Sequence, residues 1–81
     1  MMLTVDDAIS RLGLDTLDEE VRKRSLPLGP FSICREVRQG VAGFSVQDMR
    51  TSRRVRVATK REATQVAKAI EHNWLYGGDF A

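Results

Sequence analysis

The spacing of the apolar residues changes twice along this chain, and each change marks a switch of secondary structure. Val5, Ala8 and Leu12 recur at the spacing of one helix face. From residue 31 to residue 57, apolar residues instead alternate with polar ones, which is typical of strands with one buried face. The helical spacing returns after residue 60. The sequence therefore predicts an α+β fold that begins and ends with helix and has a sheet between.

Two short helices are predicted before residue 30. Thr4 caps the start of the first helix, and Gly13 ends it because glycine readily adopts the left-handed backbone conformation. Thr16 has the same capping role at the start of the second helix. Pro27 ends that helix because it disfavours helical geometry at the residue before it. Residues 27–30, with the sequence PLGP, then form a stiff connector to the sheet.

The second helix carries Leu17 and Val21 on its apolar side. Core packing is the default expectation for such residues, and any part left exposed would mark a protein interface or the seam of a homodimer. Leu14, Tyr76 and Phe80 are further apolar residues that we expect to join this surface. Leu17 and Val21 are therefore candidate interface residues.

Three strands are predicted in the middle of the chain. Arg35 interrupts the apolar side of the first strand, so we expect a bulge or an edge position there. Because the strands are consecutive and joined by short turns, an antiparallel meander is expected. The apolar residues of the three strands are Phe31, Ile33 and Val37, then Phe44 and Val46, then Val55 and Val57.

The last helix has the most regular apolar spacing of the predicted elements. Thr59 and Glu62 form a capping box at its start, and the sequence YGGD ends it. This amphipathic helix must pack its apolar stripe on one face of the sheet. The predicted core comprises Ile33, Val37, Phe44, Val46, Val55, Val57, Ala63, Val66, Ala67, Ile70 and Trp74.

The length of the chain, 81 residues, fits one small domain. We assign residues 1–81 to it, with a helical part at residues 1–30 and a strand–helix unit at residues 31–76. A domain of this size has little room for an enclosed active site. The sequence has no apolar run long enough to span a membrane, and its single cysteine excludes an internal disulfide. Its first ten residues have no basic segment followed by an apolar stretch, so we expect no signal peptide. We therefore expect the protein to be cytoplasmic.

The stretch MRTSRRVRVATKREA, residues 49–63, contains six basic residues and one acid. Val55 and Val57 are expected to face the last helix. Arg54 and Arg56 then lie on the open face of the sheet, and Arg38 falls on the same side. Guanidinium groups bind carboxylates and phosphates through paired hydrogen bonds. The predicted basic surface comprises Arg38, Arg50, Arg53, Arg54, Arg56, Lys60 and Arg61.

Charge is distributed unevenly along the chain. Residues 1–31 contain six acids and four basic residues, whereas residues 32–81 contain five acids and nine basic residues. Such asymmetry indicates an anionic partner. The net charge is only +2, and no aromatic residue is expected on the basic face, unlike the platforms that bind single strands by stacking. Basic side chains also line solvated sheet edges, so a face that only contacts water is the competing interpretation.

The three strands and the helix that opens with ATKREATQVAKAI resemble two families of DNA-binding domains over residues 31–72. These are the arm domains of lambda-type integrases and the plant ethylene-response factors, and the shared motif is T-x-x-E-A at the helix start. Those families place aromatic residues beside basic ones on the strands, whereas this sheet contains no tryptophan. The pattern is also similar to small phage and prophage proteins, among them anti-CRISPR proteins and inhibitors of host enzymes. The first resemblance implies DNA binding through the sheet, and the second implies inhibition of a host protein.

Cys34 and His72 are the only cysteine and the only histidine. Cys34 lies within a predicted strand and His72 near the end of the last helix, so we expect no nucleophile–base pair. The sequence has no ligand cluster with metal-binding spacing and no phosphate-binding glycine loop, so no metal or cofactor is predicted. We therefore interpret the chain as a non-enzymatic binding protein.

Three functional hypotheses follow. The leading hypothesis is a phage-type accessory protein that binds and inhibits a host protein or ribonucleoprotein complex, such as a CRISPR complex, through its basic hairpin surface. The first alternative is direct binding of DNA or RNA by the open sheet face. The second is a structural or assembly protein that dimerises through its N-terminal helices. None of the three involves a membrane.

Overall fold

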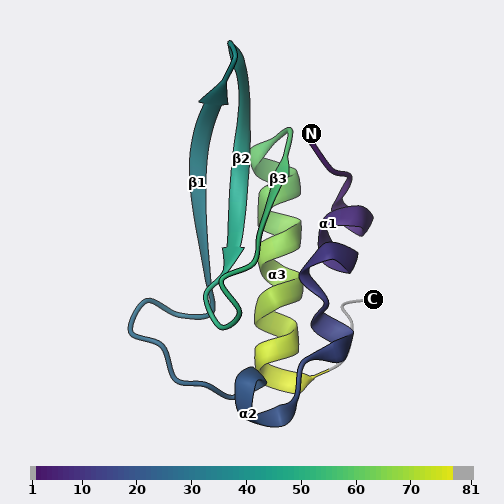
Figure 1. Ribbon diagram of the computed structural model, residues 1–81, viewed down its shortest axis with the longest axis vertical. Helices are drawn as coiled ribbons and strands as arrows, with labels where there is room; N and C mark the ends of the chain where they lie inside the picture. Colours follow the sequence, from purple (N-terminus) through teal and green to yellow (C-terminus); the bar gives the residue numbers. More distant parts are fainter. Residues whose placement is uncertain (1, 78–81) are drawn as a thin grey trace.

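A computed structural model describes residues 2–77 and confirms the α+β fold (Figure 1). None of the helices in this range is long and apolar enough to cross a membrane. The elements in chain order are α1 (Val5–Leu12), the 3₁₀ turn η1 (Leu14–Thr16), α2 (Glu19–Arg22), β1 (Phe31–Arg38), β2 (Val41–Asp48), β3 (Arg54–Val57) and α3 (Lys60–Tyr76).

The three strands form one antiparallel sheet in the order β1-β2-β3. Gln39 and Gly40 join β1 to β2, and both have positive φ angles, 52° and 77°. Such a two-residue turn matches the twist of a hairpin and fixes its register. Arg35 pairs with Phe44 in an uninterrupted ladder, so the edge position predicted for Arg35 is confirmed and there is no bulge.

Helix α3 packs on one face of the sheet, and α1 packs beside α3 and β3 (Figure 1). The segment before α1 lies along the outer edge of β3, where the Leu3 N–H donates to the Arg56 carbonyl at 2.8 Å. No helix within residues 2–77 covers the opposite face of the sheet. The buried apolar core comprises Ala8, Leu12, Leu14, Val46, Val55, Val57, Ala63, Val66, Ala67, Ala69 and Ile70.

The second N-terminal helix is shorter than predicted and begins later. Asp18 caps it instead of Thr16, because the Asp18 carboxylate accepts from the Val21 N–H at 2.9 Å. The Thr16 hydroxyl instead donates to the Gly13 carbonyl at 2.8 Å and closes the turn η1. This turn buries Leu14, and the chain then reverses into the four residues of α2.

The predicted core is wrong at Val37, which is 63% exposed. The strand alternation places Val37 on the side that faces α3, but the β1–β2 hairpin projects beyond the start of that helix (Figure 1). Ile33, Phe44 and Trp74 are only half-buried. The core therefore lies toward β2 and β3, where α1 and α3 both cover the sheet.

Candidate functional site

The face of the sheet opposite α3 is polar and basic, and we call it the open face. Val55 and Val57 are buried against the helices, and Arg54 and Arg56 lie on the other side of β3, as the alternation predicts. The register places Arg38 of β1 on that side too. The open face carries the side chains of Ser32, Cys34, Glu36, Arg38, Val41, Ser45, Gln47, Arg54 and Arg56, and none of these is aromatic.

Glu36 lies among the arginines of the open face. Its carboxylate is 3.1 Å from Arg38 Nη2 and 3.5 Å from Arg54 Nη1. The Ser45 hydroxyl also donates to Glu36 Oε1 at 2.9 Å. That hydrogen bond lowers the pKa of the Glu36 carboxyl below its usual value, and the nearby arginines lower it further against the opposing effect of burial. One acid therefore holds the cations of the open face in place without neutralising them.

Arg56 lies flat across the neighbouring strand. Its Nη2 donates to the Val41 carbonyl at 2.8 Å. Gly43 makes room for this arrangement, since a Cβ at that position would lie only 2.9 Å from Arg56 Nε. The absence of a side chain at Gly43 thus allows the Arg56 guanidinium to pack against β2.

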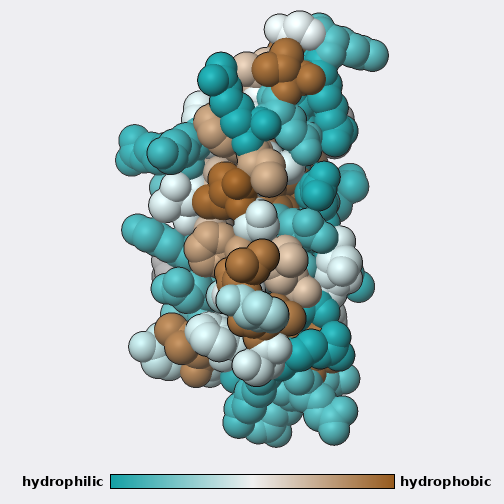
Figure 2. All heavy atoms as spheres, turned by 90° about the vertical axis from the view of Figure 1, so that its left-hand side faces the viewer, coloured by the Kyte–Doolittle hydropathy of each residue, from teal (hydrophilic) through white to brown (hydrophobic). Residues whose placement is uncertain are grey.

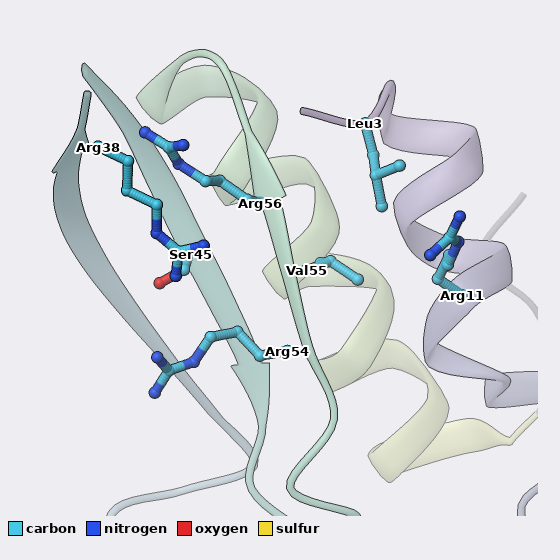
Figure 3. Close-up of a pocket in the computed structure, with 7 residues that line it drawn as sticks. All are labelled: Leu3, Arg11, Arg38, Ser45, Arg54, Val55 and Arg56. Atoms are coloured by element: carbon cyan, nitrogen blue, oxygen red, sulfur yellow. The ribbon is translucent and has the colours of Figure 1, made fainter. Parts of the chain in front are cut away.

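Arg38, Arg54 and Arg56 line a shallow hollow of about 270 Å³ (Figure 3). Figure 3 shows Arg54 and Arg56 extending from β3 across β2 toward β1, on the same side as Arg38. Arg11 lies beyond the outer edge of β3 and extends the positive charge around that edge. Sequence reasoning missed Arg11, because only the packing of α1 beside β3 brings it near. The hollow is lined by Leu3, Arg11, Arg38, Ser45, Arg54, Val55 and Arg56.

The assignment of Arg50 to the basic surface is wrong, because its side chain is completely buried. Its Nε and Nη2 donate to the two carboxylate oxygens of Asp48 at 3.1 and 3.0 Å. Its Nη1 donates to Asn73 Oδ1 and to the Arg22 carbonyl, both at 3.1 Å. This guanidinium joins the β2–β3 turn to α2 and α3, so its role is structural.

The other predicted cations are exposed, but they lie apart from the open face. Arg53 Nη1 donates to the Leu12 carbonyl at 3.2 Å, at the C-terminal end of α1, where a cation complements the helix dipole. Lys60 and Arg61 lie in the first turn of α3, which packs on the other face of the sheet. The structure therefore brings together three of the seven predicted residues and separates the rest.

Leu17 and Val21 are both half-buried. Leu17 packs against the hydrophobic core, which accounts for this residue without a partner protein. Cys34 is exposed on the open face, whereas His72 lies on α3 beyond the sheet and contacts the Tyr76 ring at 5.2 Å between centroids. The sheet separates Cys34 from His72, so the two do not form a nucleophile–base pair.

Replacing Ser45 with alanine is expected to raise the pKa of Glu36 toward the usual value of about 4.3. The lowered pKa means that ionised Glu36 stabilises the fold above its unfolded-state pKa, and this contribution disappears as the pH falls through the folded-state value. The contribution should be smaller in Ser45→Ala. NMR titration of the side-chain carboxyl carbon measures the pKa directly.

Ser32→Ala is the matched control for this titration. The Ser32 hydroxyl lies on the same face but contacts the Cys34 sulfur at 4.0 Å, not Glu36. The pKa of Glu36 should therefore stay low in this variant. An unchanged pKa in Ser45→Ala would show that the arginines alone set it.

Comparison with models of known protein families, with curated proteins and with solved structures found no match. The function is therefore inferred from the residues of this chain and their geometry.

Proposed function

We propose that this protein is a non-enzymatic binding protein that contacts an acidic protein surface through its open face and the adjoining hairpin turn. In this proposal it is a phage-type accessory protein that inhibits a host protein by stoichiometric binding. The observation that carries the proposal is the composition of the projecting hairpin. Val41 is 54% exposed on the open face, directly opposite Arg38, whose side chain is 60% exposed, and Val37 is 63% exposed on the other face of the same hairpin. Arginine is enriched at protein interfaces and in their hot spots, and exposed valines add apolar surface that a partner can bury.

The charge of the open face supports an acidic partner. Arg38, Arg54 and Arg56 together exceed the single carboxylate of Glu36 by two positive charges. An acidic groove on a host protein that handles nucleic acid, such as a component of a CRISPR complex, would provide carboxylates for these guanidiniums. Occupying that groove would exclude the chain that normally binds there.

Direct binding of duplex DNA or RNA is the second candidate, and one observation favours it. The open face carries three arginines on a sheet whose other face is covered by α3, and such a sheet can enter a groove of a duplex. Binding of single-stranded nucleic acid is disfavoured by the side chains of the open face. None of those on β1, β2 and β3 is aromatic, so unpaired bases would have no ring on which to stack.

The double variant Arg54→Ala/Arg56→Ala is expected to weaken binding to the protein partner about tenfold or more. The measurement is affinity capture from a bacterial lysate treated with nuclease, followed by titration of the purified partner. The matched control is Lys60→Ala/Arg61→Ala, which removes the same charge from the first turn of α3 and should bind normally.

Binding to random oligonucleotides across a salt series distinguishes the two candidates. Contacts from three arginines to phosphates would give a slope of about −3 in log K against log salt, because each contact releases counterions. Tight duplex binding that is lost in Arg54→Ala/Arg56→Ala would support the second candidate and contradict the first. Failure to bind either a protein or a nucleic acid would mean that the open face contacts only water.

A further inference from the structure

The outer edge of β1 is eight residues long, and no strand within the described range, residues 2–77, pairs with it. Arg38 and Val41 are paired in the ladder and flank the two-residue turn after β1. In a hairpin with a loop of this length, the two flanking residues form a hydrogen-bonded pair. Hydrogen-bonded pairs then alternate along the ladder. The bond from the Met49 N–H to the Pro30 carbonyl at 2.9 Å fits the same alternation. The backbone groups of the even-numbered residues of β1 therefore point to β2.

The odd-numbered residues of β1 consequently direct their N–H and C=O groups outward, away from the sheet. Among residues 2–77, no other backbone or side-chain group hydrogen-bonds to these outward groups. The opposite edge differs, because the Leu3 N–H covers the outward Arg56 carbonyl of β3. A free row of donors and acceptors is a template for pairing with another strand. The outward groups belong to Phe31, Ile33, Arg35 and Val37.

Exposed apolar side chains lie at both ends of this edge. Leu28, just before β1, is 84% exposed, and Val37 and Val41 at the hairpin turn are 63% and 54% exposed. Figure 2 shows the side of the molecule that carries β1, where apolar side chains form a strip flanked by hydrophilic ones. An antiparallel pairing with a second copy would bring the Leu28 end of each copy to the hairpin end of the other.

We propose that two copies of this chain associate through β1 in antiparallel register, with Cys34 opposite Cys34 of the second copy, to form a continuous six-stranded sheet. In this register Phe31 lies opposite the second copy's Val37, and such aromatic–aliphatic pairs stabilise a sheet. Ser32 lies opposite Glu36, so a small uncharged side chain and no second carboxylate faces Glu36 across the seam. The outward backbone groups and the side chains of β1 are thus both complementary to those of β1 in a second copy. This association is independent of the partner bound by the open face.

Charged side chains disfavour the registers that are centred nearer the hairpin turn. A charged residue in the middle of an edge strand discourages indiscriminate pairing. Shifting the centre to residue 35 would place two Arg35 guanidiniums directly opposite each other, and shifting it to residue 36 would do the same for two Glu36 carboxylates. Like charges in that position destabilise a sheet. The register centred on Cys34 instead pairs Arg35 with Ile33, which packs along its aliphatic stem.

Mild oxidation with diamide tests the register. Cys34 would form a non-hydrogen-bonded pair with a Cα separation of about 4.5 Å, within the range of a disulfide. Each of the two thiols loses one proton and one electron as the S–S bond forms. The N=N bond of diamide takes up the two protons and two electrons and becomes the N–N bond of a hydrazine. A cross-linked dimer is expected from the wild type. The matched control is Ser32→Cys/Cys34→Ser, whose thiol has no thiol opposite and should cross-link little. Equal cross-linking of both proteins would overturn the register.

Sedimentation of the reduced protein over a concentration series tests the association itself. The wild type should reach twice the mass of the single chain, and Arg35→Pro should remain monomeric because it removes an outward N–H without breaking a bond inside the sheet. Arg35→Ala keeps that N–H and should dimerise. A single-chain mass for the wild type at every concentration, or a dimer that persists in Arg35→Pro, would overturn the proposal. If Arg35→Pro does not fold, hydrogen exchange of the wild type decides. The Ile33 and Arg35 amides must then become protected as concentration rises, and no change would overturn the proposal.

Discussion

Replacing Arg50 with alanine is expected to lower the free energy of unfolding by about 3–5 kcal/mol. The guanidinium forms a bidentate ion pair with Asp48, and both side chains are fully buried. Its removal leaves the Asp48 carboxylate away from water without its counter-charge. Asn73 Oδ1 and the Arg22 carbonyl would each lose a hydrogen-bond donor as well. The total stability of a domain of this length is about 4–12 kcal/mol, so this loss is a large fraction of it.

Urea unfolding followed by circular dichroism measures the effect of the Arg50 substitution. Arg54→Ala is the matched control, because it removes the same side chain from an exposed position four residues away and should change stability by about 0.5 kcal/mol or less. The double variant Asp48→Ala/Arg50→Ala should lose less than the sum of the two single variants, since the uncompensated charge is gone. Equal losses in Arg50→Ala and Arg54→Ala would contradict a structural role for Arg50.

The buried role of Arg50 could not be read from the basic run that contains it. Its acceptors on Asn73 and Arg22 lie 23 and 28 positions away in the sequence, so only the tertiary fold brings them together. One local signal was present. Asp48 continues the alternation of Phe44 and Val46, so it falls on the buried side of β2. A carboxylate on a buried face requires a cation nearby, and the nearest basic residue along the chain is Arg50.

The fold and the open face were more predictable, because both follow from residue spacing. Because Val55 and Val57 face the core, the alternation in β3 places Arg54 and Arg56 on the other side of the sheet. This placement does not depend on which strand pairs with β3. Spacing does not reveal how far a neighbouring helix reaches along the sheet, which is why Val37 was misplaced. Residue spacing also does not reveal which other elements α1 packs against. Ala8 and Leu12 are fully buried because α1 packs against β3 and α3.

Replacing Ile70 with alanine is expected to lower the free energy of unfolding by about 2–5 kcal/mol. Ile70 is completely buried on α3 within the cluster that joins the helices to the sheet. The substitution removes apolar surface from the core and leaves a cavity, and the small gain in helix propensity offsets little of that loss. Thermal and urea unfolding of the purified variant measure the difference.

Leu75→Ala on the same helix isolates the contribution of burial. It removes a side chain with the same number of carbon atoms as Ile70, but from a position that is 53% exposed. The expected loss is therefore much smaller, because most of that surface is already in contact with water. A large loss at Leu75 with a small one at Ile70 would mean that α3 packs through a different face. Such a result would also move the arginines of β3 away from the open face, because α3 determines which side of the sheet is covered.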